Sequence, residues 1–254
     1  MIYQLDRTTP AAPFPDVEQA EREPDGLLAL GGDLSPERLQ NAYRHGIFPW
    51  YSRGQPILWW SPDPRWVLFP EQLRLSRSLR KTLRRGHFRV SFDQAFDTVI
   101  RACAAPRGDA ADTWLVPEMM RAYGRLHQGG VAHSVEVWAG SQLAGGLYGV
   151  AQGRVFFGES MFSHQSDASK VALVHLVDRL AAWGYQLIDC QVHTDHLERM
   201  GAVAVPRPQF TTLVRHWSQV PGRAGTWRDE PVVAPQVPHW LNQRPMVSDD
   251  PEPG

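Results

Sequence analysis

The chain has 254 residues, of which 43% are hydrophobic, and a formal net charge of -1 at pH 7. This composition excludes an intrinsically disordered protein, and the near-neutral charge neither requires nor excludes a polyanionic partner, so local charge must decide whether one binds. Two cysteines, no apolar run of about 20 residues and no signal-peptide pattern at the N-terminus predict a reduced, globular, cytoplasmic protein.

Residues 1–65 are rich in proline and glycine and are predicted to form a small N-terminal domain. The segment LSPERLQNAYRHG predicts one short helix, with Ser35 as N-cap, Pro36 at the first helical position and Gly46 as the stop. The aromatic, proline-broken segment that follows, residues 47–65, predicts an ordered loop or the edge of this domain.

From residue 66 the pattern changes to alternating elements: a basic helix, a strand, two helices, a meander of strands, a long helix, and a strand followed by a short helix and a last segment. This order predicts an α+β fold with a mixed sheet over residues 66–221. It resembles the acyl-CoA N-acetyltransferase architecture, so we expect a GNAT-like domain. Residues 222–254 are rich in proline and predict a peripheral, partly disordered C-terminal tail.

One turn of this pattern differs from the acetyltransferases. They usually cradle the CoA pyrophosphate in a glycine-rich turn before the long helix, whereas the turn MFSHQSDASK has no glycine. CoA is therefore not expected, and another acyl carrier is indicated.

Basic side chains cluster in LRLSRSLRKTLRRGHF, where Glu71 is the only acidic neighbour. A spacing of three and four places some of them on one helical face. The cluster is either a solvated helix face or a surface for a nucleic-acid backbone. The residues that share the face are Arg77, Lys81, Arg84 and Arg85.

Aromatic side chains in polar segments form a second group. They either fill a core or stack on the splayed bases of a single-stranded RNA end. The group comprises Tyr43, Trp50, Trp59, Trp60 and Trp114.

Glu159 interrupts the apolar strand VFFGESMFS, where a buried carboxylate is costly without a partner. A salt bridge to Arg154 is one explanation. A ligand pocket is the other, because Gly158 allows close approach and Met161 offers an adaptable apolar wall.

The strand LIDCQV carries Asp189 and Gln191, and a period of two places both on one face. Such a polar pair in an apolar strand needs a partner or a function. The segment also holds His193, Asp195 and His196, but their spacing matches no zinc pattern, so no metal site is predicted.

The segments GLLALGGDLSPERLQNAYRHGIFPWY, ILWWSPDPR, AHSVEVW, GGLYGV, GESMFS, DASKVAL and LIDCQV resemble, in this order, the leucyl/phenylalanyl-tRNA–protein transferases, over about residues 14–215. The resemblance implies a bacterial cytoplasmic aminoacyltransferase of the N-end rule degradation pathway. It implies transfer of Leu, Phe and less well Met from aminoacyl-tRNA to proteins that begin with Arg or Lys. It also implies a monomer without metal or cofactor.

The resemblance also implies roles for individual residues. Asp189 and Gln191 would be catalytic, the first hydrogen-bonding the incoming amine and the second orienting it or polarising the carbonyl. Tyr43, Trp50 and Trp114 would hold the 3′-terminal adenosine. The aminoacyl pocket would be formed by Phe156, Glu159, Met161, Leu173, Leu176 and Ile188.

Two positions do not fit simply. Ile188 lies on the opposite strand face from Asp189, so both serve one site only if the strand splays or ends there. Arg199 stands where the family usually has a small residue, so it either alters acceptor contacts or points to solvent.

Two other functions agree with the same patterns. One is tRNA-dependent aminoacyl transfer to a cell-wall precursor, and the other is a non-catalytic module that binds an RNA 3′ end.

Overall fold

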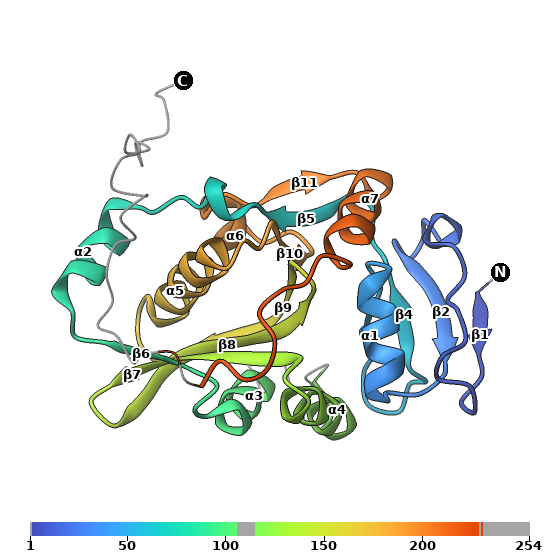
Figure 1. Ribbon diagram of the computed structural model, residues 1–254, viewed down its shortest axis with the longest axis horizontal. Coiled ribbons are helices and arrows are strands. Elements are labelled where there is room, and N and C mark those ends of the chain that lie inside the picture. Colours follow the sequence, from blue (N-terminus) through green and yellow to red (C-terminus); the bar gives the residue numbers. More distant parts are fainter. Residues whose placement is uncertain (1, 106–114, 229, 231–254) are drawn as a thin grey trace.

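The computed structural model describes residues 2–105, 115–228 and 230, and these fold around two mixed β-sheets (Figure 1). The smaller sheet has the order β1-β2-β4-β3. Its strands are β1 (Tyr3–Leu5), β2 (Leu27–Gly31), β3 (Phe48–Pro49) and β4 (Leu58–Trp60). Strands β1 and β2 are parallel and the other pairs are antiparallel.

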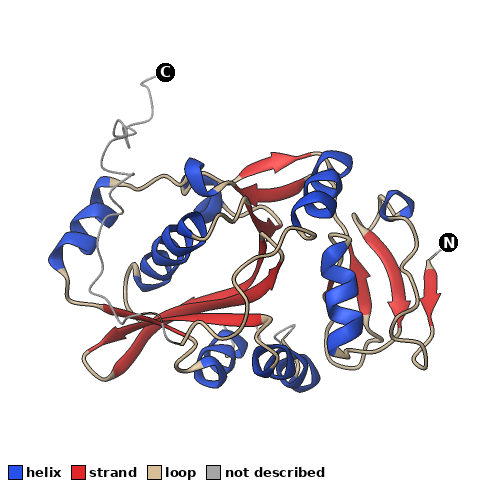
Figure 2. Ribbon diagram, in the orientation of Figure 1, coloured by secondary structure: helices blue, strands red, loops and turns tan. Residues whose placement is uncertain are grey.

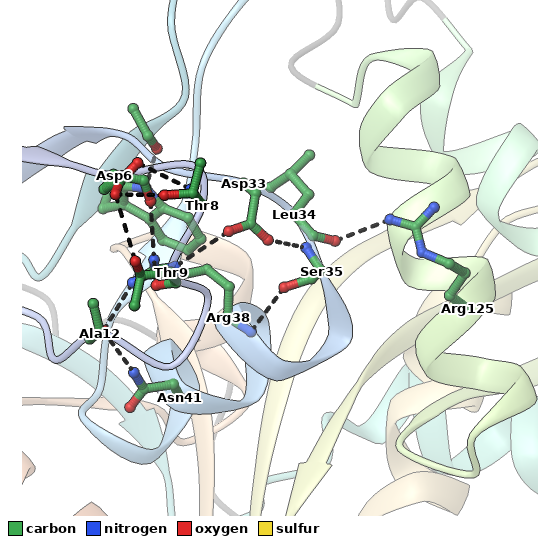
Figure 3. Close-up of polar contacts among 12 residues, drawn as sticks. Asp6, Thr8, Thr9, Ala12, Asp33, Leu34, Ser35, Arg38, Asn41 and Arg125 are labelled. Carbon is green, nitrogen blue, oxygen red and sulfur yellow. Dashed lines mark hydrogen bonds and ion pairs between the residues drawn. The ribbon is translucent and has the colours of Figure 1, made fainter.

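The first helix, α1 (Pro36–Arg44), lies between the smaller sheet and the rest of the molecule (Figure 1). Its predicted N-cap is confirmed, because the Ser35 side chain accepts a hydrogen bond from the Arg38 N–H. The fully buried Arg38 guanidinium donates to the backbone carbonyls of Ala12 and Thr9, and Arg125 reaches across to the Leu34 carbonyl at 3.0 Å (Figure 3). These contacts fix the N-terminal loop and join the small sheet to the helix that carries Arg125.

The larger sheet has the order β11-β5-β10-β9-β8-β7-β6, and β9 and β10 are its parallel pair. Its strands are β5 (Arg65–Leu68), β6 (Arg89–Phe92), β7 (Ala132–Ala139), β8 (Gln142–Gln152), β9 (Val155–Ser163), β10 (Leu187–Gln191) and β11 (Val203–Val205). The predicted mixed α/β fold is confirmed. The predicted boundary between residues 65 and 66 falls within β5.

Helices cover both faces of the larger sheet (Figure 2). Helices α3 (Phe96–Ala104) and α4 (Pro117–Gln128) pack on one face, and α5 (Ala168–Ala182) packs on the other. The remaining helices are α2 (Arg77–Arg85), α6 (Asp195–Arg199) and α7 (Arg207–Trp217), with 3-10 turns at Val17–Gln19 and Pro70–Gln72. None of the helices in the described ranges has both the length and the hydropathy that crossing a membrane requires.

Strands β9 and β10 pair over only three positions, which end at Phe157 and Asp189. At the same point β10 shifts register against β5, and Gln191 adopts a positive φ of 65°. A non-glycine residue in this conformation turns the backbone out of the strand. The two central strands therefore separate at the residues that the sequence predicted to be functional.

The C-terminal segment is not peripheral as far as it is described, which corrects the prediction for its first residues. Trp227 is completely buried and stacks on His133, with ring centroids 3.7 Å apart and planes 1° apart. Its backbone N–H donates to Asp93 Oδ2 at 2.7 Å, and the same oxygen faces His133 Nδ1 at 2.9 Å. A single tryptophan in a proline-rich segment carries no periodicity, so the sequence pattern could not reveal this anchor.

Trp227→Ala should lower the free energy of unfolding by about 3–5 kcal/mol, because it leaves a cavity beside the stacked histidine. Urea denaturation measures the change. Trp50→Ala is the matched control, since Trp50 is 46% exposed and its loss should cost less than about 1 kcal/mol. Equal and small effects of the two substitutions would contradict the anchoring role.

Candidate active site

A cavity of about 390 Å³ lies where β9 and β10 separate. It is lined by side chains from β9, β10 and α5 and by the segment around Trp50. The structure thus brings together most of the residues predicted from the sequence. These are Trp50, Phe156, Gly158, Glu159, Met161, Leu173, Leu176, Ile188, Asp189 and Gln191.

The wall of the cavity is largely apolar. Phe156 and Ile188 are paired across β9 and β10, and Leu173 and Leu176 project from one face of α5. Ile188 and the neighbouring Asp189 both border the cavity, at the point where β9 and β10 stop pairing, and the Asp189 side chain itself is buried against Arg65. Such a wall suits an apolar side chain of moderate size.

One side of the cavity was not predicted from the sequence. Thr194, His196 and Leu197 border it from α6 and the turn before α6. What could have indicated these residues in the sequence is that they directly follow the segment LIDCQV. Arg199 on the same helix is 78% exposed and lies 3.6 Å from Asp195, so it points to solvent.

The partner that Asp189 needs is Arg65. The Arg65 Nε and a terminal nitrogen donate to the two carboxylate oxygens at 2.8 and 2.7 Å, and neither side chain has exposed surface. The Arg65 guanidinium lies between the rings of Phe48 and Phe210, 4.7 Å from each centroid. Arg65 is the last residue of the motif ILWWSPDPR, yet no local pattern links it to a residue 124 positions away.

Gln191 is held at both its backbone and its side chain. Its N–H donates to Asp189 Oδ1 at 2.9 Å, and its Nε2 donates to Glu159 Oε1 at 2.9 Å. Strand alternation was therefore the wrong reason for expecting these polar groups together. The left-handed backbone at Gln191 brings them together instead.

Glu159 contacts two tyrosines besides Gln191. Its Oε1 accepts from the Tyr43 hydroxyl at 2.8 Å, and its Oε2 lies 2.6 Å from the Tyr123 hydroxyl. Burial raises the pKa of Glu159 to about 7, with a smaller increase from Asp189, although the hydrogen bonds from Tyr123, Tyr43 and Gln191 act in the opposite direction. The predicted alternative, a salt bridge to Arg154, is wrong, since the Arg154 Nε donates to the Pro221 carbonyl.

The predicted aromatic group divides into different environments. Trp50 is 46% exposed at the cavity and meets Trp60 edge to face, with centroids 5.8 Å apart. Tyr43 has no exposed surface and packs against Phe157, so it offers no face on which a base stacks in this structure. Trp59 is buried and serves the core, and Trp114 lies outside the described residues.

The predicted basic helix face is present. Arg77, Lys81, Arg84 and Arg85 are all exposed on α2, and none of them forms an ion pair with another residue in the described ranges. The apolar face of the helix, with Leu79 and Leu83, is buried. This face is therefore a concentrated positive surface on a protein without net excess of positive charge.

A group of possible metal ligands lies at the surface of the described part of the chain. His193, Asp195 and Glu198 bring ligand atoms within 4.8 Å of one another, and all three are exposed. His193 Nε2 lies 3.0 Å from Glu198 Oε2, and exposed acidic groups of this kind commonly gather without a metal ion.

Comparison with known proteins shows which family the chain belongs to. Residues 67–215 match the model of the leucyl/phenylalanyl-tRNA protein transferases, and residues 32–63 match the model of their N-terminal domain. A leucyl/phenylalanyl-tRNA–protein transferase of Nitrosomonas europaea is 60% identical over 85% of this chain and 91% of its own length. One from Pseudomonas fluorescens is 58% identical over 88% of this chain and 98% of its own length.

Among solved structures, L-PGS from Bacillus licheniformis aligns over 66% of this chain and 53% of its own length, with 7% identity and a TM-score of 0.38. A TM-score of this size is too low to show a shared fold. The family match covers more than half of the chain and agrees with the order of its motifs. The chain therefore belongs to the leucyl/phenylalanyl-tRNA protein transferase family.

Proposed function

We propose that the chain transfers an aminoacyl group from aminoacyl-tRNA to the N-terminal α-amine of an acceptor protein. The observation that carries this proposal is the apolar cavity with Glu159 and Gln191 at its polar end. The cavity wall receives the amino-acid side chain, and the polar end faces its amino and ester groups. The donor is an activated ester and the product an amide, so the reaction needs no ATP or other cofactor.

The amino acids proposed for transfer are leucine, phenylalanine and, less well, methionine, and the apolar lining of the cavity supports this proposal. Phe156, Leu176 and Ile188 belong to this wall, and we infer that it admits side chains that are unbranched at Cβ. One methyl group in an apolar pocket changes selectivity by only about 1–3 kcal/mol, so valine and isoleucine are rejected strongly but not absolutely. We extend the family function to acceptors that begin with Arg or Lys, to N-end rule degradation, and to a cytoplasmic monomer.

Gln191 is the proposed contact to the reacting groups. Its Nε2 is engaged with Glu159, which leaves the side-chain carbonyl to accept a hydrogen bond from the attacking amine. That amine has a pKa of about 8 when free, so it needs orientation more than a strong base. Asp189 is buried and paired with Arg65, and it accepts a hydrogen bond from the Gln191 N–H. These contacts support a role for Asp189 in positioning Gln191. This role replaces the predicted direct contact between Asp189 and the amine.

Two surfaces of the protein are proposed to bind the tRNA. The exposed Trp50 is proposed to stack on the 3′-terminal adenosine, together with Trp114. The basic face of α2 is proposed to contact the phosphate backbone.

The arrangement of domains also remains a proposal. Residues 1–65 would form the small N-terminal domain and residues 66–221 a GNAT-like catalytic domain, whose central parallel strands β9 and β10 separate at the acyl site. The burial of Trp227 extends the catalytic domain into the segment 222–254.

Purified protein should form a Leu-Arg peptide from radiolabelled Leu-tRNA and a peptide that begins with Arg, without ATP. The same peptide with an acetylated N-terminus is the matched control and should remain unlabelled. Absence of product at micromolar enzyme would contradict the proposal. Leucine transfer to a lipid-linked muropeptide, but not to the Arg peptide, would favour the cell-wall reaction instead.

Gln191→Ala should lower kcat by about a hundredfold with little change in tRNA affinity, because it removes a group that acts on the reacting atoms. Asp189→Asn should lower both kcat and stability, the latter by about 3 kcal/mol, because Arg65 loses its buried counter-charge. Single-turnover kinetics and urea denaturation measure the two effects. The exposed Arg199→Ala is the control, and a Gln191→Ala enzyme as active as this control would remove Gln191 from the mechanism.

Lys81→Glu should weaken tRNA binding, and reversal of all four charges on the α2 face should weaken it further. For every phosphate that the protein no longer neutralises, the slope of log K against log salt should flatten by about 0.7–0.9. Filter binding at several salt concentrations measures the slope. Arg121→Glu, an exposed reversal on α4, should leave the slope unchanged. An unaltered slope in the fourfold variant would identify the α2 face as merely solvated.

A further inference from the structure

The hydroxyls of Tyr43 and Tyr123 and the carboxyl group of Glu159 form a closed triangle of contacts beside the cavity. Tyr43 Oη lies 2.8 Å from Glu159 Oε1, Tyr123 Oη lies 2.6 Å from Glu159 Oε2, and the two hydroxyls lie 2.7 Å from each other. All three separations are those of O–H···O hydrogen bonds, and each such bond needs one proton between its oxygens. The triangle therefore needs three protons.

The two tyrosines supply only two of these protons. An ionised Glu159 supplies none, and one of the three contacts would then join two oxygens without a proton. A neutral Glu159 completes the set: it donates to Tyr123, Tyr123 donates to Tyr43, and Tyr43 donates back to Glu159 Oε1. Gln191 Nε2 donates to the same Oε1, which accepts both bonds through its two lone pairs.

The surroundings favour this neutral ring. Tyr43 and Tyr123 have no exposed surface, and Glu159 is 9% exposed. Asp189 is the nearby carboxylate, and its charge is balanced by Arg65. Burial raises the pKa of Glu159 to about 7 and raises the pKa of Tyr43, Tyr123 and the neighbouring Tyr148 well above the usual value, so the hydroxyls keep their protons.

We propose that this ring keeps Glu159 neutral in the empty cavity, and that Glu159 releases one proton when the charged amino group of an aminoacyl ligand binds beside it. Tyr123 is then a positioning residue, which holds the carboxyl in both states. The proposal rests on the proposed function, since it takes the aminoacyl end of the donor as the ligand.

The proton balance of this step is simple. The O–H bond of Glu159 breaks, its proton passes to solvent, and the carboxylate pairs with the ligand ammonium. Tyr43 and Tyr123 then each donate to one carboxylate oxygen, and the contact between the two hydroxyls, which no longer holds a proton, lengthens. A deacylated tRNA end brings no ammonium and gains no ion pair, so the ring favours release of the spent tRNA over the charged one.

The first test uses the protein without ligand. Infrared spectra of wild type minus Glu159→Gln should show the carbonyl band of a protonated carboxyl at pH 6, and this band should disappear above about pH 8. The amide of Glu159→Gln preserves one donor and one acceptor, so the fold should be kept. Absence of the band at pH 6 would overturn the ring, whatever the outcome of the transfer assay.

The second test is calorimetry with 3′-leucylamino-3′-deoxyadenosine, whose amide link resists transfer, in buffers of different ionisation enthalpy. At pH 6 the ligand amine is fully charged, so wild type should release close to one proton and Glu159→Gln none. Equal release by the two proteins would refute the proposal. Failure of the ligand to bind wild type, with the infrared band present, would refute the proposed function and leave the ring intact.

Tyr123→Phe separates positioning from mere packing. Loss of the hydroxyl that accepts the proton of neutral Glu159 opens the ring, so the pKa of Glu159 should fall and the pH midpoint of proton release should shift downward. Tyr51→Phe removes the hydroxyl of a buried tyrosine outside the ring and is the matched control. Thermal unfolding checks that both variants fold. A midpoint that stays at the wild-type pH in Tyr123→Phe, or a Tyr51→Phe shift of the same size, would refute the role of Tyr123.

Discussion

The buried ion pair between Arg65 and Asp189 is the interaction on which the rest of the site depends. Neither group has access to water, so each charge is stable only because the other lies within 2.7 Å. Arg65 also lies between Phe48 of β3 and Phe210 of α7. One guanidinium thus joins the small sheet, the end of β10 and the C-terminal helix, and fixes where the separated strands lie.

This pair also decides how β10 ends. Asp189 accepts the N–H of Gln191, which supports a left-handed backbone that a strand residue rarely adopts. The turn directs the Gln191 side chain toward Glu159 on β9, across the gap where β9 and β10 no longer pair. The polar end of the cavity therefore forms where β10 ends, and the apolar wall is formed by the paired parts of β9 and β10 together with α5.

Two carboxyl groups of the same site meet opposite environments. Asp189 is paired with a guanidinium and holds a charge, whereas Glu159 faces hydroxyls, an amide and apolar walls. Environments that differ in this way separate the protonation states of neighbouring acids, which is how one site holds a fixed charge and a variable one. The fixed charge positions the backbone, and the variable one is the group that we propose to meet the ligand.

The sequence by itself determined the mixed α/β fold, the N-cap of α1, the exposed basic face of α2 and half of the residues around the cavity. These depend on local periodicity, capping residues and long distinctive motifs, which neighbouring residues encode. It also showed that Asp189 and Glu159 each needed an explanation, because a buried carboxylate is costly.

Only the tertiary structure decided what that explanation was. Arg65 lies 124 positions from Asp189, Tyr43 lies 116 positions from Glu159, and Trp227 lies 134 positions from Asp93, so no spacing rule connects them. Such contacts arise when separate elements pack, and the choice among many possible partners is made by the geometry of the whole fold.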